Sequence, residues 1–174
     1  MNPYFGHLKT ICTHKYYVFL ACCKAGIPWR GLMHDLSKFS FVEFWTSARY
    51  WTGKSSPISA EREMLGFSCA WQHHKAHNPH HWEYWVDFRN DGTEVYGKIP
   101  LPVAKEMVCD WLGAGKAYNG KNWKQSTPLS YFQSHETYYK LHPDTKCLVL
   151  TFLEKIDSEG ENDALAWLRE IKEY

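Results

Sequence analysis

Five of the ten histidines in this 174-residue chain lie within nine residues, in a tract that spans residues 73–81. Elsewhere the chain carries an adjacent His34-Asp35 pair, an isolated His14 and a lone Asp110. Imidazole is the commonest metal ligand in proteins, and a carboxylate is the usual partner of a hard divalent ion. These residue types therefore predict either a metal site or a histidine-rich surface tract.

The candidate metal ligands come from four separate segments, each expected to be helical. They are His14, His34, Asp35, Asp110 and, from the tract, His74, His80 and His81. An adjacent histidine and aspartate on a helix point about a third of a turn apart, so both reach one ion only above that helix face. Mixed imidazole and carboxylate ligands suit Mn, Fe, Co, Ni or Zn, and we expect one or two such ions.

Each candidate also has a purely structural interpretation. Asp110 lies in an apolar segment, where a buried carboxylate without a partner is costly, and a metal ion is the simplest partner. A histidine in a helix rich in Tyr and Phe, such as His14, is ordinarily a hydrogen-bonded core residue. We expect His73 and His77 of the tract to lie behind the ligands or to be exposed, and the histidines with no supporting pattern to be ordinary residues: His7, His135 and His142.

The elements that must position these residues are helices, because apolar residues recur at helical spacing almost throughout the chain. The spacing predicts helices over residues 5–24, 29–51 (with a break near 37–40), 57–77, 102–116, 128–141, 143–157 and 160–172. Loops are expected at 52–56 and 118–128, and a turn or small hairpin within 87–100. Because proline disfavours a helical residue before it, Asn78-Pro79 should divide the tract between two elements. The fold class is all-α, with about six to eight helices.

Length and composition indicate a single domain over residues 1–174. The candidate ligands place the metal-site core in residues 1–118 and leave 119–174 as C-terminal helices. The formal net charge of +1 excludes a strongly basic surface for duplex nucleic acid. None of the six cysteines forms a C-x-x-C pair, which argues against a zinc ribbon and favours a reducing compartment. We therefore expect a cytoplasmic protein, in a bacterial or host cytosol. The apolar run at residues 16–23 is too short to span a bilayer, so no membrane partner is expected.

The order His14, His34-Asp35, histidine tract and Asp110 resembles that of the HD-domain superfamily of metal-dependent phosphohydrolases. Three phrases are similar to those of small HD-like proteins from bacteria and phages: G-I-P-W-R-G-L-M-H-D-L-S-K-F, H-H-K-A-H-N-P-H-H-W-E-Y-W and E-M-V-C-D-W. The resemblance covers roughly residues 7–118 and implies a compact HD-like helical bundle. It implies that His14, His34, Asp35 and Asp110 hold a first metal, and that Asp35 bridges to a second metal held by the tract.

The chain departs from the HD pattern at Lys38, since many nucleotide-cleaving HD enzymes carry a glutamate three residues after the His-Asp pair. Water activation would then depend on metal or on another carboxylate, such as Glu43, Glu83 or Glu106. The predicted catalytic residues are therefore Asp35, Lys38 and Glu106. The close spacing of the tract histidines is a second departure, and it leaves the number of metal ions open.

The predicted contacts to a substrate phosphate are Lys38, Arg30 and Lys75. Trp82, Tyr84 and Trp85 could stack on a base, although aromatic residues at this spacing more often belong to a core. The leading hypothesis is a metal-dependent phosphohydrolase that acts on a small molecule, namely a nucleotide or a related phosphate ester. The alternatives are a mixed-valent di-iron oxygenase of the HD type, whose ligand set overlaps, and a non-catalytic module that binds metal or nucleotide. Self-association is compatible with each of them.

Overall fold

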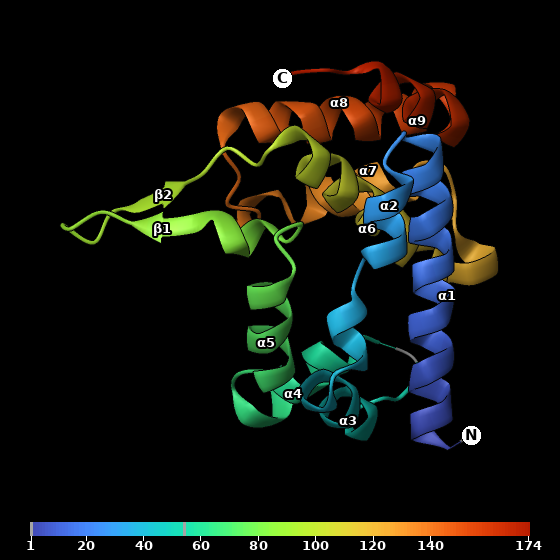
Figure 1. Cartoon of the computed structure of the whole chain (residues 1–174), viewed down its shortest axis with the longest axis vertical. Helices are drawn as coiled ribbons and strands as arrows, with labels where there is room; N and C mark the ends of the chain where they lie inside the picture. Colours follow the sequence, from blue (N-terminus) through green and yellow to red (C-terminus); the bar gives the residue numbers. More distant parts are fainter. Residues whose placement is uncertain (1, 54) are drawn as a thin grey trace.

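The computed structural model describes residues 2–53 and 55–174, and this part of the chain is almost entirely helical (Figure 1). The α-helices are α1 (Pro3–Lys24), α2 (Pro28–Met33), α3 (Phe41–Arg49), α4 (Pro57–Leu65), α5 (Cys69–His77), α6 (Leu101–Asn119), α7 (Thr127–Ser134), α8 (Pro143–Glu159) and α9 (Glu161–Glu170). Short 3-10 helices are η1 (Leu36–Phe39), η2 (Trp82–Trp85), η3 (Gly120–Asn122) and η4 (Glu136–Tyr138). The predicted all-α class is confirmed.

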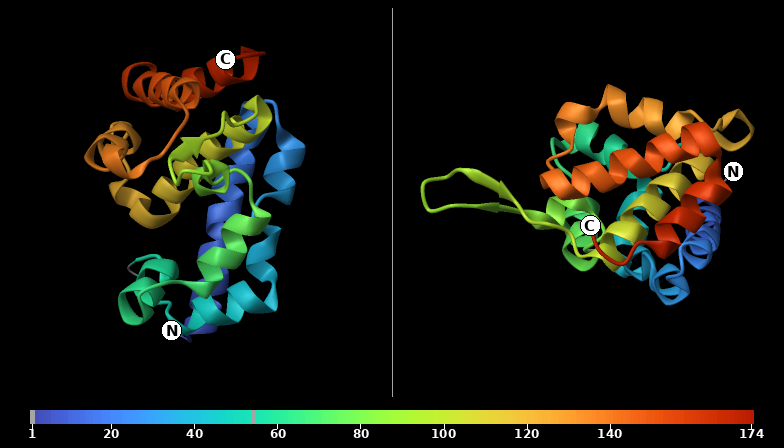
Figure 2. Two further views of the ribbon diagram at one scale, coloured as in Figure 1. Left: turned by 90° about the vertical axis from the view of Figure 1, so that its left-hand side faces the viewer. Right: turned by 90° about the horizontal axis from the view of Figure 1, so that it is seen from above.

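A small hairpin is the one β structure in the described residues. Strands β1 (Val86–Phe88) and β2 (Glu94–Tyr96) pair antiparallel, with Val86 opposite Tyr96. Gly92 takes a φ of 84° in the turn between them, a conformation that glycine adopts without steric cost. The hairpin begins one residue before the predicted region 87–100 and otherwise lies inside it, and it projects away from the helical body (Figure 2).

The apolar core is built around α1 and α6, which pack along each other. Gly113 permits this close approach, since a Cβ atom there would lie 2.5 Å from Val18 Cγ2. Helices α8 and α9 lie across one end of this pair and add Phe152 and Leu165 to the same core (Figure 1). The C-terminal helices thus share a core with α1 and α6, the helices that carry His14 and Asp110.

Two of the predicted helices are interrupted in ways that matter for the site. The segment predicted at 29–51 has the expected break near 37–40, where η1 gives way to the extended Ser40 before α3, and it has a second, unexpected break at His34-Asp35 after α2. The segment predicted at 57–77 consists of α4 and α5, because Gly66 has a left-handed φ of 79° that ends α4. Ser68 then begins α5, and its side chain accepts a hydrogen bond from Trp71 N at 3.0 Å.

The helix predicted at 128–141 is shorter than expected, because α7 ends at Ser134 and only the short η4 follows it. The other helix boundaries follow the prediction within a few residues. Helix α5 ends at His77, and Asn78-Pro79 separates it from His80 and His81, which precede η2. The expected loop at 52–56 includes residue 54, which lies outside the described residues. Every helix in the described ranges is too short or too polar to cross a lipid bilayer.

Candidate metal centre

Asp35 lies at the centre of the cluster and owes its position to an unusual backbone conformation. Its φ of 54° and ψ of 28° are left-handed, and it is the sole non-glycine residue with a positive φ in the described chain. Aspartate is among the few residues that tolerate this conformation. His34 and Asp35 therefore lie in a link between α2 and η1. The prediction that they lie on one helix, with side chains a third of a turn apart, is wrong. Lys15 on α1 holds this link, because its Nζ donates to the backbone oxygen of His34.

The first ligand group consists of His14, His34, Asp35 and Asp110, and all four residues are buried. Their candidate ligand atoms lie within 4.8 Å of one another. His14 Nε2 is 3.0 Å from Asp110 Oδ1, and His34 Nε2 is 3.2 Å from Asp35 Oδ2. Helices α1 and α6 and the α2–η1 link thus bring together residues that are far apart in sequence.

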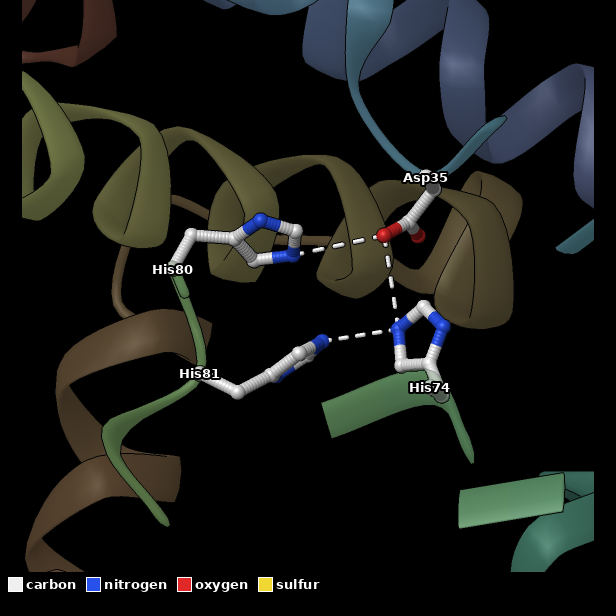
Figure 3. Close-up of side chains that lie close together, drawn as sticks. All are labelled: Asp35, His74, His80 and His81. Atoms are coloured by element: carbon white, nitrogen blue, oxygen red, sulfur yellow. Dashed lines mark hydrogen bonds and ion pairs between the residues drawn. The ribbon is translucent and has the colours of Figure 1, made fainter. Parts of the chain in front are cut away.

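The second ligand group consists of Asp35, His74, His80 and His81 (Figure 3). His74 Nε2 and His80 Nε2 each lie 3.3 Å from Asp35 Oδ1, and His81 Nε2 lies 2.8 Å from His74 Nε2. The two oxygens of Asp35 therefore face different groups: Oδ2 faces the first and Oδ1 the second. This is the arrangement of a carboxylate that bridges two ions.

Several buried polar atoms in this cluster lack a conventional partner. Neither oxygen of Asp35 accepts a hydrogen bond of ordinary geometry, although Lys38 Nζ lies 2.6 Å from Oδ2, and His80 Nε2 is also unpaired. Leaving such atoms unsatisfied costs about 1–3 kcal/mol each, and more for a charged group. A divalent cation in each of the two groups would satisfy them all, so the residues present fit a metal.

The carboxylates of the cluster favour a positive charge on His34, whereas burial and the neighbouring histidines keep His81 neutral. Burial alone would lower the pKa of His34, but Asp35, Asp110 and Glu106 outweigh burial and raise that pKa well above its usual value. Burial, together with His80 and His74, holds the pKa of His81 well below its usual value. His81 is therefore neutral, which is the form of imidazole that binds metals.

Glu106 lies behind two of the ligand histidines. Its Oε1 is 3.0 Å from His34 Nδ1 and 3.1 Å from His80 Nδ1, and its Oε2 is 2.7 Å from Arg30 Nε. Burial alone would raise the pKa of Glu106, but its hydrogen bonds to His34 and His80 lower the value to about 2. When Nδ1–H of a histidine donates to a carboxylate, the ring is held and its Nε2 lone pair is directed at the metal. His34, His80 and Glu106 also form a third group with metal-ligand spacing, but these hydrogen bonds favour an orienting role for Glu106.

Glu43 on α3 contacts a ligand histidine of the second group in the same manner, through the Nδ1 atom of the ring. Its Oε2 lies 2.7 Å from His74 Nδ1, and its Oε1 lies 2.7 Å from His73 Nδ1. The sequence suggested Glu43 only as a carboxylate that could activate water, and it pointed to neither this contact nor the contact of Lys15. No local sequence pattern could have predicted these two contacts, because the two partners in each contact lie on different structural elements.

The three predicted phosphate contacts occupy different places. Lys38 is 26 % exposed and lies at the edge of the cluster beside Asp35, whereas Arg30 is engaged by Glu106. Lys75 lines a groove of about 510 Å³ at the base of the hairpin, and its role toward a phosphate stays a prediction. Among the aromatic candidates, Trp82 and Trp85 pack against the core and Tyr84 is exposed.

The histidines that were expected to lie outside the ligand set do lie outside the two ligand groups. His73 and His77 stack on each other, with ring centroids 4.1 Å apart, and neither belongs to a ligand group. His7 is buried beside Phe44, and burial together with the charge of Lys38 lowers its pKa to about 4. The seven predicted ligands are thus the seven residues that the two groups contain.

We expect Glu106→Gln to weaken metal binding by about 10-fold to 100-fold without unfolding the protein, because it removes the charge that orients two ligand histidines. Competition with a chromophoric chelator measures this affinity. Glu173→Gln, at an exposed position near the C-terminus, is the matched control and should bind metal as the wild type does. Equal affinities for the two variants would show that Glu106 does not position the ligands.

A family model described as a family of unknown function (DUF5662) matches residues 4–155. That range runs from α1 into α8 and includes every residue of the two ligand groups. No curated protein and no solved structure matches the chain.

Proposed function

This chain belongs to the DUF5662 family, whose function is unknown, and we propose that it is a metal-dependent phosphohydrolase acting on a nucleotide or a related phosphate ester. The observation that carries the proposal is the position of Asp35, whose two oxygens face two separate ligand groups. A carboxylate bridge between two ions is typical of sites that cleave phosphate esters. The juxtaposition of His14, His34, Asp35 and Asp110 also supports the resemblance to HD-domain proteins.

The two ligand groups would hold one ion each, drawn from Mn, Fe, Co, Ni or Zn, since imidazole with carboxylate suits these metals. A pair of such ions lowers the pKa of bound water and stabilises charge on the attacking and leaving oxygens. The chain itself supplies rigidity, because Glu106 and Glu43 hold the rings of His34, His80 and His74.

A substrate phosphate would approach from the side of Lys38 and His81, the partly exposed members of the cluster. Burial opposes the charge of Lys38, but Asp35 and Asp110 outweigh it and raise the pKa of Lys38 further, so the ammonium stays charged. We assign Lys38 to binding the phosphate oxygens and Arg30 to fixing Glu106. With the carboxylates committed to the histidines, water activation would rely on the metal ions rather than on Glu106. The six free cysteines support a cytosolic location.

Lys38→Met should lower kcat/KM about 10-fold or more, mainly through KM, because it removes a charge-assisted contact to the phosphate. Metal content should stay at the wild-type level, since Lys38 is not a ligand. Steady-state kinetics and elemental analysis of one preparation measure both quantities, and Lys121→Met at an exposed position is the control. A Lys38→Met variant with an unchanged KM would remove Lys38 from the substrate site.

The function is tested by loading the metal-stripped protein separately with Mn, Fe, Co, Ni and Zn. Each form is offered nucleotides, cyclic nucleotides and simple phosphate esters, and release of phosphate or pyrophosphate is measured. We expect release that a chelator abolishes and added metal restores. Oxygen uptake by the iron form with no phosphate release would support an oxygenase instead, and tight nucleotide binding without turnover in every form would support a binding module.

A further inference from the structure

Helix α1 is apolar on both of its faces. Its inner face contributes Ile11 and Val18 to the buried interior. The outer face is exposed, and its apolar residues recur every three or four positions: Phe5, Leu8, Cys12, Tyr16, Phe19 and Leu20. A surface helix normally carries polar residues on its outer side, and a helix that is apolar all round is normally buried. The outer face of α1 therefore has the character of a contact surface.

The neighbouring elements continue this surface. On α2 and η1 the exposed apolar residues are Trp29, Leu32, Met33, Leu36 and Phe39. On α3 they include Phe41, which is 78 % exposed. Trp45 joins α3 to the start of α1, because its ring centroid lies 5.0 Å from that of Tyr4. At the other end, α2 approaches the backbone of α1 closely, since a Cβ atom added to Gly31 would lie 3.2 Å from Phe19 Cα. Helices α2 and α3 pack against opposite halves of α1 (Figure 1), and we call the exposed surface of the three helices the α1–α3 flank.

We propose that the α1–α3 flank is the interface of a homodimer. Thirteen large apolar side chains between residues 5 and 45 are each at least 37 % exposed. Seven of them are aromatic, and an aromatic side chain buries on the order of 150–250 Å² when fully covered, so about half of that from each of the seven gives roughly 700 Å². The six non-aromatic side chains add to this area. One side of a standard protein–protein interface buries about 800 Å². The flank is thus large enough to hold two chains together.

The charges of the flank favour a protein partner over an anionic lipid surface. Residues 2–53 contain two carboxylates, Asp35 and Glu43, and both are buried in the metal centre. Most of the cations there are engaged within the chain as well: Lys15 with the His34 carbonyl, Lys38 with Asp35, Arg30 with Glu106 and Lys24 with Glu161. Few cations remain for lipid headgroups, and the flank is instead rich in aromatic residues and poor in charge, like the centre of a protein interface.

A second copy of the chain is the simplest such partner, since most soluble oligomers are homo-oligomers and two-fold dimers are the commonest. The proposal is independent of the function of the metal centre. Even so, the interface would brace the elements that carry His14, His34 and Asp35, because these residues lie on the inner side of α1 and in the α2–η1 link.

Sedimentation equilibrium of the full chain at micromolar concentration tests the proposal. We expect the wild type to have twice the mass of one chain. The double variant Phe5→Glu with Trp29→Glu should raise the dimer dissociation constant about 100-fold or more, because each change places a charge in an apolar contact. The matched control is Phe88→Glu, which adds the same charge at a 60 % exposed aromatic residue on the hairpin and should leave the dimer intact.

Three results would overturn the proposal: a monomeric wild type, a double variant that dimerises as the wild type does, or dissociation caused by Phe88→Glu. A monomeric wild type that sediments with phosphatidylglycerol vesicles would identify the flank as a lipid contact instead. Far-ultraviolet circular dichroism and metal content, both expected to match the wild type, show that the double variant is folded.

Discussion

Asp35→Asn is expected to produce a folded protein that binds neither metal ion and releases phosphate at less than about a thousandth of the wild-type rate. The expected loss is this large because the ligands of the two groups act together, and removing one member of such a set abolishes most of the activity of the whole set. Asparagine keeps the shape of the side chain and tolerates the left-handed backbone at this position. It removes the negative charge that faces both ligand groups. Elemental analysis and a phosphate-release assay on the same preparation measure the two losses.

Asp87→Asn is the matched control, because Asp87 is an exposed aspartate in β1 and lies outside both ligand groups. It should keep full metal content and full activity. An Asp35→Asn protein that retains two ions would contradict the bridging role. Retained metal with lost activity would instead assign Asp35 to the chemistry and leave metal binding to the histidines.

His14→Ala and His81→Ala should each remove one ion and keep the other. His14 belongs to the first ligand group and His81 to the second, while Asp35 belongs to both. We expect two ions per wild-type chain and about one in each variant. The value of kcat should fall about 100-fold or more, because half of the charge that stabilises the transition state is lost.

His77→Ala is the control for both variants, since His77 is exposed and lies outside the ligand groups. It should retain two ions and full activity. A wild-type protein with a single ion, unchanged by His81→Ala and lost in His14→Ala, would show that only the first group binds metal. The opposite pattern would place the single ion among the tract histidines.

The membership of the cluster could be predicted from sequence because it depends on residue type and order. His14 and Asp110 lie on long helices with regular apolar spacing, so their inward direction follows from the helical period. The division of the tract at Asn78-Pro79 was also predictable, since proline restricts the residue before it.

The break at His34-Asp35 was not predictable, because the left-handed conformation of Asp35 has no local signal such as a glycine. It is held by tertiary contacts, including the hydrogen bond from Lys15 to the His34 carbonyl. The division between α4 and α5 did have a signal, since Gly66 is a common helix terminator, but the apolar spacing continued across it.

The carboxylates behind the histidines mark the limit of sequence reasoning about the site. Glu43 and His74 are 31 residues apart, and Glu106 and His34 are 72 residues apart. Each pair is made by the packing of two elements, so neither residue shows its partner in its own sequence context. Residue type and order along the chain could assign the histidines to a site, but they could not identify the carboxylates that orient those histidines.

If the two ligand groups hold metal as proposed, the wide separation of His14 and Asp110 along the chain would link the abundance of this protein to the metal supply of its cell. Because the unfolded chain does not hold these two side chains together, an ion bound by both of them would stabilise only the folded state. At a free ion concentration one hundred times Kd, that stabilisation is about 2.7 kcal/mol. Changes of about 1–2 kcal/mol alter steady-state protein levels several-fold through proteolysis of unfolded chains. Metal starvation would therefore deplete the protein as well as inactivate it.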